Sequence, residues 1–171
     1  MTSGIVRRVD SLGRVVIPKE IRKVLKIKEN EQLEIKVEDD KIILSKYSDI
    51  HDYDKSINNL VNVIKDISNK DIIITNLNKI VITSKDYKDY LGIELNSYLL
   101  NILDNRKNIE ELTPNKLKIT DKEINVSYVI KPIIIHGDTV GLIMMLSNTN
   151  ISRNDLDLLT LLENYLINYL E

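Results

Sequence analysis

Cysteine, tryptophan and phenylalanine are absent from this sequence of 171 residues. Without cysteine the chain can form no disulfide bond, no thiolate nucleophile and no cysteine-ligated zinc or iron–sulfur site. Its hydrophobic runs are short, since none approaches the roughly eighteen consecutive apolar residues of a membrane-spanning helix. The N-terminus also lacks the apolar core of a signal peptide. We therefore expect a soluble protein of the cytoplasm.

Residues typical of catalytic or metal-binding sites are scarce. The two histidines, His51 and His136, lie far apart in the sequence, and His136 precedes a glycine in a predicted tight turn. Acidic pairs such as Glu110 with Glu111 fit a solvated surface. The sequence contains no phosphate-binding glycine loop and no nucleophile elbow. We expect no enzymatic activity, no cofactor and no metal.

Positive charge is concentrated at the N-terminal end of the chain. Residues 1–28 contain eight Lys or Arg and two acidic residues, which gives this segment a net charge of +6. Residues 29–40 reverse the sign, with six acidic residues and one Lys, and residues 48–171 contain 13 basic and 18 acidic residues. The overall net charge of -2 therefore conceals a basic surface of the kind that binds polyanions.

The N-terminal block predicts two hairpins joined by a short helix. Short β-branched runs at 4–9 and 14–17 flank "DSLG", where Asp10 can bond the turn backbone. Pro18 then favours a helix start, and the following basic residues recur on one helical face. "QLEIKVEDDKIILSKY" alternates apolar and polar residues around Asp39–Asp40. Because a block of this size buries little core alone, we expect it to fold as a dimer.

The periodicity changes after Ile50. Apolar residues spaced three and four apart up to Ile67 predict a helix with a coiled-coil-like seam. A hairpin is expected over 72–83, a helical stretch divided by Gly92 over 87–108, and strands over 116–120, 126–135 and 140–147. The final segment, 154–171, is apolar on most of its circumference, so we expect burial on more than one side. This order of elements predicts an α+β domain.

The stretch "TSGIVRRVDSLGRVVIPKEIRKVLKIKENEQLEIKVEDDKIILSKY", residues 2–47, resembles the AbrB-type DNA-binding domain. The resemblance implies an all-β swapped-hairpin barrel with a short helix, in which two chains interleave. It also implies that DNA faces the basic residues of the first hairpin and the helix. In this sequence these are Arg7, Arg8, Arg14, Arg22 and Lys23. The family often has arginine at the Lys23 position, and lysine lacks the planar fork that holds a phosphate or guanine in two bonds.

The whole chain resembles AbrB-family sporulation regulators that carry a C-terminal GAF domain. "VIKPIIIHGDTVGLIMMLS" is similar to the closing hairpin of GAF domains, with Gly137 and Gly141 at the turn and strand positions. There is no cysteine to attach a bilin and no cyclic-nucleotide signature, so the ligand stays open. Tyr87, Tyr90 and Tyr98 are candidates for the core or for the lining of a pocket.

These observations lead to one expected organisation and several alternatives. Residues 1–47 would form the AbrB-type swapped-hairpin DNA-binding domain, and residues 50–171 the GAF-like sensory and oligomerisation domain. The protein would be a nucleoid-associated transcriptional regulator of sporulation genes. It would recognise double-stranded DNA by sequence or shape, as a homodimer or homotetramer, and an unknown small effector could modulate it. The alternatives are an antitoxin with an AbrB fold, a DNA-binding assembly protein without ligand sensing, or a small enzyme.

Overall fold

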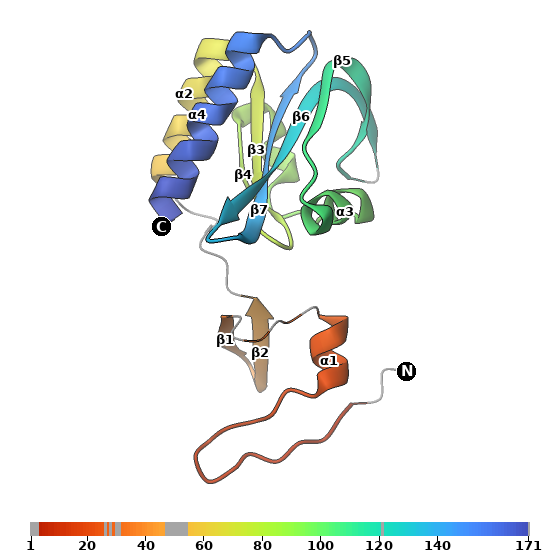
Figure 1. The fold of residues 1–171 in the computed structure, drawn as a ribbon, viewed down its shortest axis with the longest axis vertical. Helices are drawn as coiled ribbons and strands as arrows, with labels where there is room; N and C mark the ends of the chain where they lie inside the picture. Colours follow the sequence, from red (N-terminus) through yellow and green to blue (C-terminus); the bar gives the residue numbers. More distant parts are fainter. Residues whose placement is uncertain are drawn as a thin grey trace. The chain divides into compact units, whose positions relative to one another are not determined.

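The computed structural model describes residues 4–25, 27, 29, 32–46, 55–120 and 122–170. The chain divides into two compact units, Met1–Tyr47 and Ser48–Glu171 (Figure 1). Each unit is described separately below.

The first unit contains one helix and one regular hairpin. Helix α1, Lys19–Val24, follows Pro18, whose fixed φ suits the entry to a helix. Strands β1, Leu33–Glu38, and β2, Lys41–Lys46, pair antiparallel as the sequence predicts. The turn between them places Asp39 at φ 51°, a conformation that Asp and Asn tolerate better than most residues. The helix and second hairpin predicted for this block are therefore confirmed.

The first predicted hairpin is only partly present in a single chain. Its turn is closed by backbone bonds from Gly13 N to Asp10 O at 3.0 Å and from Asp10 N to Arg14 O at 3.1 Å. The flanking segments, 4–10 and 14–17, have no regular secondary structure. Their β-branched side chains have no layer to pack on, and Val6 and Val16 are 87% and 74% exposed. A turn alone does not maintain a two-stranded ladder without an apolar face to bury.

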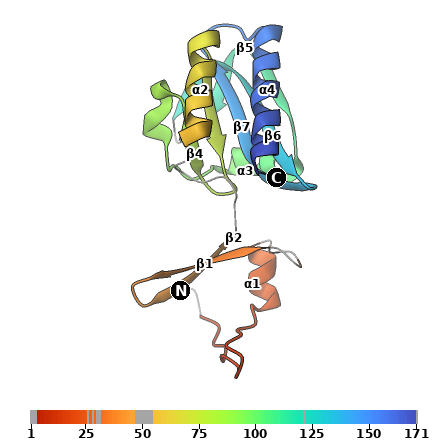
Figure 2. The ribbon, with the colours of Figure 1, turned by 90° about the vertical axis from the view of Figure 1, so that its left-hand side faces the viewer.

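The second unit is a five-stranded antiparallel sheet with helices on both faces. Its strand order is β4-β3-β7-β6-β5. The strands are β3, Asp71–Thr75; β4, Ile80–Thr83; β5, Ile109–Lys118; β6, Glu123–Ile135; and β7, Asp138–Ser147. Helices α2, Lys55–Ser68, and α4, Arg153–Leu170, lie side by side on one face (Figure 2). The 3-10 helix η1, Lys85–Tyr90, and helix α3, Ser97–Asn105, pack on the other face. The predicted α+β architecture is confirmed.

Successive side chains along the strands point to opposite faces of the sheet and so contribute to a hydrophobic core on each face. Ile72 and Ile74 on β3 pack toward α2 and α4, whereas Ile73 packs toward α3, and all three are fully buried. This follows from the two-residue repeat of a strand in a sheet covered on both faces. The strand predicted at 116–120 overlaps the end of a longer edge strand, β5, which ends at Lys118. The first half was missed because its polar residues are exposed and a bulge between Glu111 and Asn115 interrupts the pairing.

Two glycines of the β6–β7 hairpin have defined structural roles. His136 and Gly137 both adopt positive φ, 49° and 84°, so the tight turn fits a glycine at its second position. His136 is thus a turn residue. At Gly141 an added Cβ would collide with the carbonyl oxygen of Thr75 on β3. The two strands can approach this closely only because residue 141 has no side chain.

The predicted seam on α2 faces the core of its own unit. Ile57 and Ile64 are buried against the sheet and α4, whereas Ile67 is 69% exposed. Ile50 and Tyr53, which begin the predicted seam, lie outside the described residues. The apolar stripe therefore packs against its own sheet, and the expectation of a coiled-coil-like seam is wrong for these buried positions.

The prediction that the last helix is buried on more than one side is also wrong for a single chain. Helix α4 buries one stripe that includes Leu159, Leu162 and Leu166. Leu161 is 54% exposed, and Tyr169 is also largely exposed. The apolar residues of α4 therefore exceed those that its own unit buries, and the remainder lie on an exposed side of the helix.

Candidate nucleic-acid interface

The basic residues of the first unit lie on two local elements. Arg7, Arg8 and Arg14 lie on the N-terminal arm, residues 4–17, with Arg7 and Arg8 before its turn and Arg14 after it. All three are exposed, and the Arg7 Nη1 group makes only a long contact of 3.4 Å with the carbonyl oxygen of Val6. Flexible, exposed guanidinium groups of this kind can reach phosphate oxygens or base edges.

The turn between these arginines is organised by one carboxylate. Asp10 Oδ1 accepts hydrogen bonds from the backbone N–H of Leu12 at 2.9 Å and of Arg14 at 2.8 Å. Asp10 Oδ2 accepts from Arg14 Nε at 2.8 Å. The backbone N–H and the guanidinium of Arg14 hold the pKa of Asp10 below 3.8, so this acid is ionised at neutral pH. Arg14 is therefore the arm residue whose side chain has a fixed partner.

Helix α1 presents the remaining candidates. Lys19, Arg22 and Lys23 are spaced i, i+3 and i+4 and are exposed, whereas Ile21 on another side is partly buried. The Arg22 N–H donates to Pro18 O at 2.9 Å, which forms the first turn of the helix. Lys19 was not among the five residues expected to face DNA, although it belongs to the same basic stripe of the helix.

The β1–β2 hairpin exposes an apolar face. The cross-strand pairs Ile35 with Leu44 and Val37 with Ile42 place four apolar side chains on one side of the hairpin. Their exposed fractions are 67%, 44%, 74% and 74%, respectively. Among the described residues of this unit, Pro18 is the single residue classed as buried. The unit therefore has almost no hydrophobic core within one chain.

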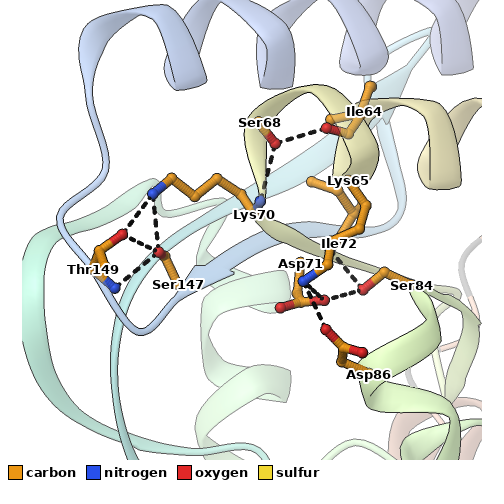
Figure 3. A network of polar contacts seen from close by, with 10 residues as sticks. All are labelled: Ile64, Lys65, Ser68, Lys70, Asp71, Ile72, Ser84, Asp86, Ser147 and Thr149. Carbon is orange, nitrogen blue, oxygen red and sulfur yellow. Dashed lines mark hydrogen bonds and ion pairs between the residues drawn. The ribbon is translucent and has the colours of Figure 1, made fainter.

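Two polar networks in the second unit were not predicted (Figure 3). In the first, Lys65 of α2 forms ion pairs of 2.8 Å with Asp71 of β3 and with Asp86 of η1. The Asp71 carboxylate also accepts from Ser84 Oγ at 2.7 Å. Burial lowers the pKa of Lys65, but the bonds to the two carboxylates outweigh burial and raise it above 10.5. The network connects α2 to the segment that covers the opposite face of the sheet.

The second network surrounds a buried lysine. Lys70 is 7% exposed and donates to Ser147 Oγ at 3.1 Å and to Thr149 Oγ1 at 2.8 Å (Figure 3). It also donates to the carbonyl oxygen of Asn150 at 3.1 Å. An ammonium group has three donors, and three neutral oxygens satisfy them. This arrangement connects the start of β3 to the segment between β7 and α4 and is structural.

Three tyrosines were candidates for the core or a pocket. Tyr87 and Tyr90 of η1 are partly buried against the core beneath α3, and their ring centroids lie 5.2 Å apart. Tyr98 is 40% exposed, so the expectation of a core position is wrong for this residue. Its side chain bonds the hydroxyl of Tyr128, and burial together with this bond raises the pKa of Tyr128 to about 12.

The described ranges contain no group of three or more His, Asp or Glu residues arranged to hold a metal ion. No helix within them is long and apolar enough to cross a membrane.

Comparison with known proteins explains the two-unit organisation. A family profile described as "Stage V sporulation protein T C-terminal, transcription factor" matches residues 49–160. Stage V sporulation protein T of Bacillus subtilis (strain 168) is 35% identical over 150 residues, which covers 85% of this chain and 84% of the relative. The chain belongs to the stage V sporulation protein T family. It is therefore a sporulation transcription regulator.

The N-terminal unit of this stage V sporulation protein T family member has further relatives. Transition state regulatory protein AbrB of Bacillus subtilis (strain 168) is 63% identical over 46 residues, 27% of this chain and 48% of AbrB. Residues 6–50 also match a profile described as "Antidote-toxin recognition MazE, bacterial antitoxin". The AbrB-like nature of the first unit is therefore confirmed.

The second unit is GAF-like. The GAF domain/HD domain protein of Geobacter sulfurreducens superposes with a TM-score of 0.50 at 12% identity, covering 67% of this chain and 89% of that chain. At this identity the similarity shows the fold alone. The stage V sporulation protein T family member thus combines an AbrB-like unit with a GAF-like unit.

Proposed function

We propose that this chain regulates sporulation genes by binding double-stranded DNA through residues 1–47, with Arg7, Arg8, Arg14, Arg22 and Lys23 as the contact residues. The observation that carries the proposal is the exposure of all five basic side chains on a unit that is 63% identical to AbrB. A basic surface of this kind neutralises phosphates and releases counterions, which supplies most non-specific affinity. Base edges and DNA shape then supply the discrimination.

The DNA-binding unit is a homodimer in this proposal. The four apolar residues on one face of the β1–β2 hairpin and the β-branched residues of the arm are exposed in one chain. A second copy that lays its own arm and hairpin against them would bury these side chains and complete the strands that residues 4–17 do not form alone. The result is the swapped-hairpin barrel, which doubles the number of basic residues facing DNA.

The test is a pair of double substitutions compared over a range of salt. Arg14→Ala/Arg22→Ala should weaken DNA binding and reduce the slope of log K against log salt, because fewer phosphates are neutralised. The matched control, Lys85→Ala/Lys88→Ala, removes two exposed positive charges from η1 in the other unit and should leave both quantities unchanged. Equal affinity of a folded Arg14→Ala/Arg22→Ala protein and the wild type would refute the assignment.

The second unit supplies assembly and sensing in this proposal, over residues 50–171. The α2–α4 layer exposes apolar side chains on both helices, among them Val63, Ile67, Leu161, Tyr165 and Tyr169. The rings of Tyr165 and Tyr169 stack at 5.9 Å. Isologous contact through this layer, added to the N-terminal dimer, would close a homotetramer. Sedimentation should show a tetramer, and Leu161→Ser should reduce it to a dimer.

Effector sensing rests on the connection between the two units. The ion pairs of Lys65 join α2, the first described helix after the DNA-binding unit, to η1 on the other side of the sheet. A small effector that shifts η1 or α3 would act on α2 through these ion pairs and would favour one packing of that helix. The fraction of protein in the DNA-binding assembly would change as a result. Insertion of a Gly-Ser run between Ser48 and Asp49 should preserve DNA binding and abolish such coupling.

The antitoxin alternative is supported by the profile that matches residues 6–50. Such an antitoxin would use a disordered, toxin-binding tail, whereas residues 71–147 of this chain form a five-stranded sheet with two buried cores. We propose that the protein acts at the nucleoid in the cytoplasm and performs no catalysis. Purified protein that shifts DNA alone and copurifies with no toxin would support the regulator over the antitoxin.

A further inference from the structure

An acidic residue occupies the centre of the basic arm, where it opposes the attraction of DNA. Asp10 lies between Arg8 and Arg14 and carries a negative charge at neutral pH, and the N–H groups of Arg14 lower its pKa further. Each carboxylate beside a phosphate-binding surface repels the phosphates and reduces affinity. The turn could be closed by an uncharged Asn or Ser, since the side chains of both bond a turn backbone. The charge of Asp10 therefore needs a further explanation.

The geometry of the Asp10–Arg14 contact provides one. A single carboxylate accepts from two backbone N–H groups, on Leu12 and Arg14, and from the Arg14 side chain at Nε. The backbone bonds fix the carboxylate relative to the turn, and the ion pair then fixes the guanidinium relative to the carboxylate. The Arg14 side chain remains 71% exposed in this pair, so its position is restrained without being buried.

The part of the guanidinium that Asp10 engages decides what Arg14 can bind. A guanidinium has five N–H donors in a rigid plane, and the contact with Asp10 is made through the single Nε–H. This leaves the terminal nitrogens Nη1 and Nη2, which together can donate two hydrogen bonds to a pair of neighbouring acceptors. Two acceptors at the matching spacing occur on DNA as O6 and N7 of guanine in the major groove and as two oxygens of one phosphate.

We propose that Asp10 is a positioning residue that holds Arg14 by Nε so that its terminal nitrogens bind one pair of acceptors on DNA. The inference rests on the proposed function, because it assumes that the arm contacts DNA. An arginine side chain loses rotamer entropy when it is immobilised, and the contact with Asp10 restricts the side chain before DNA arrives. The charge of Asp10 thus weakens the attraction of the arm to phosphates, but its contact with Arg14 preorganises that side chain for a two-bond contact with DNA.

The charge of Asp10 and its positioning of Arg14 predict opposite effects of Asp10→Asn on DNA affinity. Asp10→Asn keeps a carbonyl oxygen that can accept from the backbone N–H groups of the turn. It removes the negative charge, and it replaces the second oxygen by an NH2 group, which cannot accept from Arg14 Nε. If only charge matters, the variant should bind DNA more tightly. If positioning dominates, it should bind less tightly to a duplex that the wild type selects from a random pool. Loss of a whole bidentate contact corresponds to about 5- to 150-fold, and we expect a loss of at least about 5-fold.

Two controls separate positioning from a general effect on the unit. Asp40→Asn removes the same charge at the exposed turn between β1 and β2 and should leave affinity unchanged or slightly tighter. In an Arg14→Ala background, Asp10→Asn should no longer weaken binding, because the group it orients is gone; the removed charge should then tighten binding. The thermal unfolding of each variant should match the wild type, since Asp10 and Arg14 are exposed.

Each outcome has a defined meaning. Loss of affinity in Asp10→Asn that disappears in the Arg14→Ala background supports positioning. A loss confined to the selected duplex, and reproduced by 7-deazaguanine in that duplex, identifies guanine, whereas an equal loss on an unselected duplex identifies a phosphate. Tighter binding by Asp10→Asn, or the same loss with and without Arg14, overturns the inference. No effect of Arg14→Ala itself would instead count against the assignment of Arg14 in the proposed function.

Discussion

Replacement of Val37 by serine tests whether a second copy covers the β1–β2 hairpin. In a single chain Val37 is 74% exposed, so the substitution should cost almost nothing if the unit functions alone. In the dimer the side chain would be buried, and full burial of a valine contributes about 1.5–3 kcal/mol. Two symmetric copies double this figure, so the dimer of the first unit should weaken by roughly 10²- to 10⁴-fold.

The assay must report on the first unit alone, because the α2–α4 layer is expected to hold chains together independently. Amide hydrogen exchange of residues 33–46 in the full-length protein does so. Protection of these amides should rise with protein concentration in the wild type and should be lost in Val37→Ser at the same concentration. DNA affinity should fall in parallel.

The matched control is Lys36→Ser on the opposite face of the same strand. Lys36 is exposed and pairs with Glu34 at 3.0 Å, an exposed contact of about 1 kcal/mol or less. In Lys36→Ser the protection of amides 33–46 from hydrogen exchange should therefore match that of the wild type. If Val37→Ser and Lys36→Ser retain equal protection and equal DNA affinity, no second chain covers this face, and the dimeric barrel is wrong.

Three further predictions concern the second unit. Gly141→Ala should lower its thermal stability by about 1–3 kcal/mol or more, because the new methyl group meets the carbonyl oxygen of strand β3, and unchanged melting would contradict this close approach. Lys70→Ala should cost about 1–3 kcal/mol by leaving buried acceptors unpaired, whereas Lys88→Ala, at an exposed site on η1, should be neutral in the same denaturant titration. In an alkaline absorbance titration Tyr87 and Tyr128 should ionise at about pH 12 rather than 10.0. Their contribution to stability is therefore complete below pH 10 and is lost as the pH rises through 12, and ionisation of every tyrosine near 10 would refute their burial.

Local patterns predicted those elements whose partners are close in the sequence. The β1–β2 and β6–β7 hairpins follow from alternation and turn residues such as Asp39 and Gly137, because both strands and the turn lie within one short window. The strands of the arm were predicted equally from β-branched runs, yet they do not form in one chain. Strand propensity describes a surface that fits a sheet, and in the proposed dimer the neighbouring strand would belong to a second copy.

The basic site was predictable and the polar networks were not. Arg7, Arg8, Arg14, Arg22 and Lys23 occur within one short segment, and the resemblance to AbrB-type domains points to each of them. Their exposure agrees with that expectation.

Lys70 and Ser147, in contrast, are 77 residues apart, so their contact depends on the completed sheet. The ion pairs of Lys65 with Asp71 and Asp86 likewise require α2, β3 and η1 to be folded. Partner choice by a charged side chain is a tertiary property, which neither spacing nor composition encodes.

The near absence of a core in the first unit has a genetic consequence. If that unit folds only as a pair, a subunit with neutralised arginines and an intact apolar face would still pair with a normal subunit. Such mixed pairs would be folded and yet would present half of the basic surface to DNA. In a cell that makes both versions in equal amounts, most pairs would contain a defective member, so alleles that alter the arm should be dominant. Alleles that disrupt the apolar face should be recessive, because their products never join a normal chain.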